Sequence, residues 1–174
     1  MTVYYLLNQN QSGINSQFIF DEQYHPLFLL TGQFGFGQGS MNLLTIDGDY
    51  LGSIAQTKNN FGKVFQLELN HQAIGQMRKL SGVWHQFAFV STLNWTVMGS
   101  LTTNTYQATH GVHTVFSAEP TLVKKNLDGF KLSIRDDDEK LSCILVAATL
   151  NQWAINAQKK AAYRFNPFAN VVPN

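Results

Sequence analysis

Charged side chains are scarce in this sequence. Lysine and arginine number 12 and aspartate and glutamate 11, so charged residues make up 13% of the 174 residues, against roughly 25% in an average globular protein. The net charge of +1 leaves no overall positive field to attract the phosphates of a nucleic acid. We therefore expect no nucleic-acid partner and a surface made mainly of neutral polar side chains.

Cysteine occurs only once, at Cys143. A single cysteine excludes an intrachain disulfide, and its place inside an apolar run predicts a buried side chain rather than a reactive thiol. The N-terminal segment MTVYYLLNQNQSG has no basic stretch followed by a long apolar run, so we expect no secretory signal. Together these observations predict an intracellular, cytoplasmic protein.

Long hydrophobic runs are also lacking, apart from the segment 141–157. Residues 143–148 are all apolar and would cover every face of a helix, which is typical of a helix buried on all sides. The four acids at 136–139 suit its start, because carboxylates cap and stabilise the positive end of a helix dipole. We predict a helix at about 139–160. It is less apolar than a bilayer span of about 20 residues, so no transmembrane segment is expected.

Glycine recurs at regular places in the rest of the chain. Asp47-Gly48 separates two short apolar segments, which is a strong signal for a β-hairpin. Gly52, Gly75 and Gly99 follow such turns in the returning strands, 23 and 24 residues apart. A strand glycine lets a neighbouring backbone come close, which favours a closed sheet. Later strands are predicted at 112–117, 122–126 and 130–135, with Asp128-Gly129 in the last turn.

Many short strands followed by one fully apolar helix restrict the fold. A two-layer sandwich has no place for a helix that is covered on every side, whereas a barrel of about twelve strands can hold a helix ~10 Å across. We predict a mostly β protein, a closed antiparallel barrel of about twelve strands wrapped around one C-terminal helix. The length fits one domain, predicted at 1–162, with an irregular tail at 163–174.

Several segments resemble the LURP-one-related, YxjI-like family, which has the tubby C-terminal-like fold. They are FIFDE at 18–22, LTG at 30–32, LTIDG at 44–48, LGSI at 51–54, FKLSI at 130–134 and LSCILVAA at 141–148. The resemblance implies a barrel of about twelve strands around a central hydrophobic helix. Tubby domains bind phosphoinositide headgroups, and the related scramblase-like proteins act at membranes. The lysines and arginines that hold the headgroup in tubby have no match here, so no site is carried over.

The few charges are unevenly placed. Residues 1–57 contain four acids and no lysine or arginine, whereas 58–125 contain six basic residues and two acids. We expect Arg78, Lys79, Lys124 and Lys125 to form a basic rim that binds a ligand. The sequence thus predicts a non-enzymatic intracellular binding module, with weak binding of anionic lipid headgroups. A protein-interaction or regulatory module is the alternative, and a small enzyme with an unrecognised pocket is the second alternative.

Residues that could carry catalysis or hold a metal form no complete pattern. His110 and His113 have the spacing of metal ligands, but no third ligand accompanies them. No nucleophile elbow and no cysteine with a histidine partner can be identified. The glycines at 35–39 precede no helix of the phosphate-binding kind, so we interpret them as bends. We expect no catalytic residue, metal or cofactor.

Overall fold

The computed structural model describes residues 1–7, 16–34, 39–57, 64–80, 86–123 and 127–165. They form twelve strands, one short 3-10 helix and one long α-helix. In chain order these are β1 (Thr2–Leu7), β2 (Ser16–Phe20), β3 (Pro26–Phe34), β4 (Gly39–Thr45), β5 (Tyr50–Thr57), β6 (Val64–Leu69), β7 (Gln72–Leu80), β8 (Gln86–Val90), β9 (Trp95–Ser100), β10 (Thr105–His110), β11 (His113–Val123), β12 (Leu127–Ile134), η2 (Asp137–Glu139) and α1 (Lys140–Phe165).

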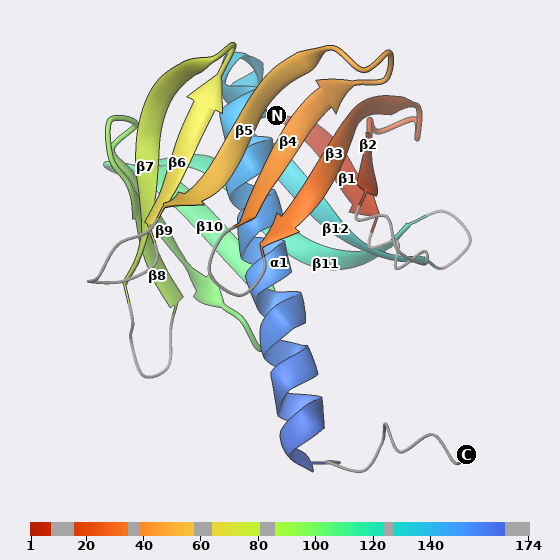
Figure 1. Cartoon of the computed structure of the whole chain (residues 1–174), viewed down its shortest axis with the longest axis vertical. Helices are drawn as coiled ribbons and strands as arrows, with labels where there is room; N and C mark the ends of the chain where they lie inside the picture. The colour runs from red at the N-terminus through yellow and green to blue at the C-terminus, as the bar shows by residue number, and fades with distance from the viewer. Residues whose placement is uncertain (8–15, 35–38, 58–63, 81–85, 124–126, 166–174) are drawn as a thin grey trace.

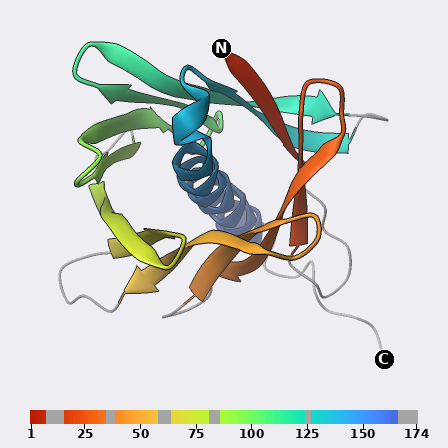
Figure 2. The same cartoon turned by 90° about the horizontal axis from the view of Figure 1, so that it is seen from above.

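The twelve strands form one closed antiparallel barrel. Each strand pairs with its neighbours in the chain, and β1 pairs with β12 along its whole length, from Thr2 opposite Ile134 to Leu7 opposite Gly129. The view along the helix shows the wall surrounding α1 (Figure 2). This confirms the predicted fold class, a closed barrel of about twelve strands with one C-terminal helix.

The first part of α1 is the centre of the core. Residues 143–148 are at most 2% exposed, and they share one apolar cluster with inward-facing side chains of every strand, such as Leu6, Leu43, Met77 and Leu132. Because the barrel covers the helix on all sides, no polar face is needed, which explains the all-round apolar pattern. The C-terminal turns of α1 project beyond the wall (Figure 1).

The acidic run before α1 caps the helix, as predicted. Asp136 is extended, and its carboxylate accepts a hydrogen bond of 3.1 Å from the backbone N–H of Asp138. Asp137 to Glu139 then form η2, which leads directly into α1. The helix ends at Phe165 rather than near residue 160, so 163–165 belong to it and the predicted tail begins too early.

The recurrent glycines lie where backbones crowd together. A Cβ atom on Gly52 would stand 2.5 Å from the carbonyl oxygen of Glu68, and one on Gly75 would stand 2.5 Å from that of Ser91. Gly99 faces the backbone of Thr105 and Tyr106 in the same way. The predicted turn at Gly48 is present, with a φ of +98° that is open to glycine but rarely to other residues.

One predicted hairpin differs from the structure. The candidates at 112–117 and 122–126 both overlap a single strand, β11, which runs from His113 to Val123, and residues 124–126 lie outside the described residues. Asp128-Gly129 lies within β12, opposite Leu122 and Thr121. Pro120 lies within β11, between the two predicted segments. The ladder between β10 and β11 stops at Ala118, so beyond it β11 has the character of an edge strand, where proline is tolerated.

Candidate functional site

The connections between strands fall into two sets at opposite ends of the barrel. One end holds the described turns at 21–25, 46–49, 70–71, 91–94 and 111–112, together with η2 and the start of α1 (Figure 1). α1 leaves the barrel at the other end. There, the side chain of Asn104, in the turn after β9, donates a 2.9 Å hydrogen bond from Nδ2 to Oδ1 of Asn151.

Acidic side chains gather at the end where α1 begins, which we call the acidic end. The basic residues at this end are Arg135 and Lys140. Lys140 Nζ donates a 2.6 Å hydrogen bond to Oδ2 of Asp137 and forms an ion pair with it. Nine of the 11 carboxylates of the chain lie at this end: Asp21, Glu22, Asp47, Asp49, Glu68, Asp136, Asp137, Asp138 and Glu139. The acidic end therefore carries a strong excess of negative charge.

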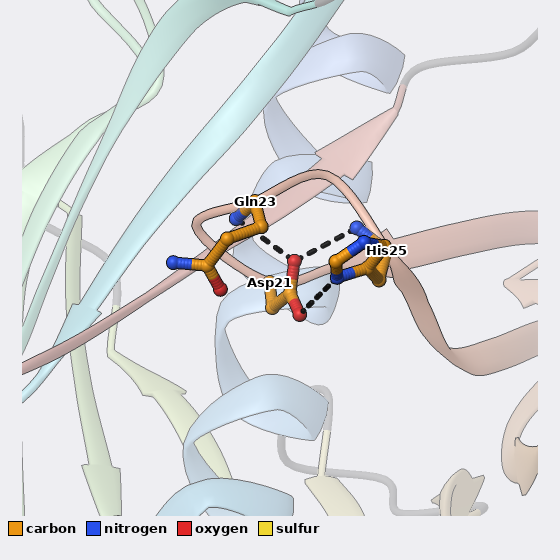
Figure 3. A network of polar contacts seen from close by, with 3 residues as sticks. All are labelled: Asp21, Gln23 and His25. Carbon is orange, nitrogen blue, oxygen red and sulfur yellow. Dashed lines mark hydrogen bonds and ion pairs between the residues drawn. The ribbon is translucent and has the colours of Figure 1, made fainter.

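Asp136 caps η2, and the Glu22 carboxylate accepts a 3.1 Å hydrogen bond from the backbone N–H of Val3. Asp21 and Asp137 make more contacts. The Asp21 carboxylate accepts hydrogen bonds from the backbone N–H groups of Gln23 (2.9 Å) and His25 (2.7 Å), and its other oxygen lies 3.3 Å from His25 Nδ1 (Figure 3). The bond from the His25 backbone is the main reason that the pKa of Asp21 is lowered. The bond from Lys140 lowers the pKa of Asp137, helped by the hydroxyl of Tyr4 at 2.5 Å. The Asp21 and Asp137 carboxylates therefore favour their charged form, and their hydrogen bonds stabilise the turn at 21–25 and the start of α1.

Basic residues gather at the opposite end, which we call the basic end. Arg78 and Lys79 lie near the end of β7, and the last turns of α1 carry Lys159, Lys160 and Arg164. Among the described residues, the acid at this end is Asp128, at the start of β12. Negative charge therefore lies at the N-terminal end of α1 and positive charge at its C-terminal end, which is the arrangement that the helix dipole favours.

The predicted pair Arg78 and Lys79 does not share one face of the wall. Neighbouring strand residues point to opposite sides. Arg78 is exposed on the outer face, whereas the Nζ atom of Lys79 lies 5.1 Å from the ring centre of Trp153 of α1. Lys79 therefore joins the wall to the helix, and Arg78 is the member of the pair that is open to a ligand.

The other two predicted rim residues, Lys124 and Lys125, lie outside the described residues. Lys159, Lys160 and Arg164 were not among the candidates predicted from the sequence. Lys159 and Lys160 lie at the end of the predicted helix, and Arg164 was interpreted as part of an irregular tail. The continued absence of glycine and proline as far as Phe165 was the available signal.

A thiol and a pair of histidines are the first groups in the described part of the chain to consider for catalysis. Cys143 is fully buried, which raises the pKa of its thiol and leaves it inert as a nucleophile. His110 and His113 lie opposite each other beside the β10–β11 turn. Among the described residues, no group of three or more His, Cys, Asp or Glu side chains could hold a metal ion.

An open depression of about 420 Å³ lies on the outer wall over β9, β10 and β11, where Met98, Gln107, Ser117 and Glu119 contribute to its lining. Tyr106 also lines it, but its hydroxyl donates to the carbonyl of Leu150, 3.4 Å away. Glu119 is paired with Lys131 at 3.1 Å. The depression therefore offers one titratable group, already paired, which is a poor basis for acid and base catalysis.

No helix among the described residues is long and apolar enough to cross a membrane. Comparisons of the chain with protein-family models, with curated proteins and with solved structures give no match. The resemblance to the LURP-one-related family therefore stays a prediction.

Proposed function

We propose that this protein is a non-enzymatic binding module whose basic end binds anionic lipid headgroups weakly. The observation that carries the proposal is the separation of charge along α1, with nine carboxylates at one end and Arg78, Lys159, Lys160 and Arg164 at the other. A molecule with this distribution is attracted to an anionic surface through one end only, because the acidic end is repelled.

The expected strength depends on the number of charges. Each basic residue close to an anionic bilayer contributes about 1 kcal/mol, so the four named residues give an affinity in the millimolar to high micromolar range. Because Arg78 is exposed, its attraction to the bilayer is screened by salt. The resemblance to the tubby C-terminal-like fold adds support, because tubby domains bind such headgroups.

The experiment is co-sedimentation with vesicles of neutral phosphatidylcholine, with and without an added phosphoinositide, at low and high salt. Wild type should pellet with the phosphoinositide vesicles at low salt and be released at high salt. Arg78→Gln should weaken binding about fivefold, the equivalent of about 1 kcal/mol. Lys160→Gln should do the same if the projecting turns of α1 take part.

The matched control is Arg135→Gln, which removes an exposed arginine from the acidic end with the same change in net charge. It should bind like wild type. Equal weakening by Arg78→Gln and Arg135→Gln would mean that only net charge matters and would contradict the proposal. An excess of free inositol phosphate tests the source of the anion, because it should displace a protein that binds one headgroup but not one attracted by the whole surface.

A further inference from the structure

The register of the first four strands brings apolar side chains together on the outside of the barrel. Tyr5 lies opposite Phe20 on the neighbouring strand. Phe18 lies opposite Leu29, which in turn lies opposite Leu44. The residues between them, Leu6, Ile19, Leu30 and Leu43, are buried against α1. Because side chains alternate along a strand, Tyr5, Phe18, Phe20, Leu29 and Leu44 all face outward.

These outward side chains form one connected surface. The rings of Phe18 and Phe20 are 6.3 Å apart, and Tyr5 stacks on Tyr24 at 5.0 Å. Phe18 is 38% exposed and Leu27 37%. We call the set of Tyr5, Phe18, Phe20, Leu27, Leu29 and Leu44 the aromatic patch. Single exposed apolar residues are ordinary, but a connected set that includes aromatic rings is typical of an interaction surface.

The border of the aromatic patch is acidic. Glu22 lies in the turn that joins β2 to β3, and Asp47 and Asp49 lie in the turn that joins β4 to β5. The carboxylates of Asp47 and Asp49 have no hydrogen bond or ion pair with any other described residue. Residues 1–57, which contain the whole patch, include no lysine or arginine.

The nearest basic residue along the sheet is already paired. Lys131 of β12 lies opposite Tyr5, and its Nζ atom is 3.1 Å from Oε1 of Glu119 on β11. The aromatic patch therefore combines an apolar floor with the unpaired carboxylates of Asp47 and Asp49 at its border, while the Glu22 carboxylate accepts a 3.1 Å hydrogen bond from the backbone N–H of Val3. An anionic lipid surface would be repelled here, whereas a cationic chain would be attracted.

We propose that the aromatic patch docks a basic segment of a partner protein in which arginine or lysine alternates with an aliphatic or aromatic residue. The basic side chains would pair with Asp47, Asp49 and Glu22, and the apolar ones would lie on Phe18 and Leu29. Arginine suits such a surface best, because its planar guanidinium pairs with carboxylates and also stacks on aromatic rings. This site lies away from the basic end and does not depend on the proposed lipid binding.

The test is the fluorescence anisotropy of two labelled peptides, one alternating Arg with Leu and one alternating Glu with Leu. Wild type should bind the Arg–Leu peptide and not the Glu–Leu peptide. Phe18→Ser should weaken binding about tenfold, as expected for a central aromatic contact. Asp47→Asn with Asp49→Asn should weaken it to a similar extent and reduce its dependence on salt.

Two matched controls test whether a loss of binding is specific to the aromatic patch or follows from removing any exposed apolar or acidic side chain. Leu122→Ser removes an apolar side chain that is 62% exposed on β11, and Asp138→Asn with Glu139→Gln removes two acids beside the start of α1. Both should bind the Arg–Leu peptide like wild type. Melting temperatures establish that each variant is folded, and the Asp47 and Asp49 variant, which alters no packed side chain, keeps the test valid if Phe18→Ser is unstable.

Equal weakening by the patch variants and the controls would overturn the proposal, as would equal binding of the two peptides. Analytical ultracentrifugation adds one further outcome. A concentration-dependent dimer that is lost in Phe18→Ser would assign the aromatic patch to a second copy of this chain, and that result would also overturn a basic partner segment as the occupant.

Discussion

Replacing Gly75 by alanine gives a direct test of why glycine recurs in the returning strands. Gly75 lies on β7, and a Cβ atom there would stand 2.5 Å from the carbonyl oxygen of Ser91. Real Cβ atoms essentially never approach so closely, and the obstacle is backbone rather than a movable side chain. Either β7 or the turn after β8 has to move by several tenths of an ångström.

The cost of that movement can be worked out from the bonds that hold Ser91. Its backbone N–H donates to the carbonyl of Gln76 at 2.8 Å. Its hydroxyl oxygen lies 3.2 Å from both the backbone N–H and the backbone carbonyl of Gln76. Each such bond contributes about 1 kcal/mol, and overpacking a tight site costs about 1 to 3 kcal/mol. We therefore expect Gly75→Ala to lose about 2 to 3 kcal/mol of unfolding free energy.

For a chain of this length, 1 kcal/mol corresponds to about 2 to 4 °C of melting temperature, so Gly75→Ala should melt roughly 5 to 10 °C below wild type. Urea unfolding of Gly75→Ala, Ser91→Ala and the double variant then forms a double-mutant cycle. The double variant should lose less than the sum of the single variants, because Ser91→Ala has already removed the hydroxyl bonds. A Gly75→Ala protein that melts like wild type, or losses that add completely, would refute the reasoning.

The remaining predictions concern the core and the start of the helix. Ala148→Lys, at a position of α1 that is 2% exposed, should abolish soluble folding, because an unpaired buried charge costs several kcal/mol of a total of about 5 to 15; soluble protein with an unchanged melting temperature would contradict it. The pKa of Asp137 is lowered by Lys140 and Tyr4, so its stabilisation is present above its unfolded pKa of about 4 and is lost as the pH falls through its folded pKa. Urea unfolding should therefore show a larger stability difference between wild type and Asp137→Asn near neutral pH than near pH ~2, and a difference independent of pH would show that the paired carboxylate contributes nothing.

Local sequence signals were enough to predict the architecture. The Asp47-Gly48 turn, the strand glycines Gly52, Gly75 and Gly99, and the run 143–148 each predicted a feature that the structure contains. These signals work because each reports a local constraint: a turn that needs positive φ, a close backbone approach, or a helix without a polar face. Together they leave few folds besides a barrel around a helix.

The candidate site was harder to predict because it depends on which side of a strand each residue faces and on where each helix or strand ends. Arg78 and Lys79 are adjacent in sequence, and only their place in a strand shows that one faces solvent and the other Trp153. Strand alternation from the buried Met77 would have placed Lys79 inside. The aromatic patch was missed for a related reason, since it exists only once the register places Phe18, Leu29 and Leu44 side by side.

The separation of charge is not something that folding requires. A single cap at Asp136 and one ion pair at Asp137 satisfy the start of α1, whereas exposed acids such as Asp47 and Asp49 add mutual repulsion without a described partner. Repulsion among like charges lowers stability, and the helix dipole favours only the charges within the first and last turns of α1, so stability alone does not explain the acids in the turns between strands. Sites that break a local rule with no structural compensation are the ones expected to serve function. The separation of charge is therefore consistent with the two proposed partners, an anionic one at the basic end and a basic one at the aromatic patch. Neutralising Asp47 and Asp49 should raise stability slightly while it weakens docking.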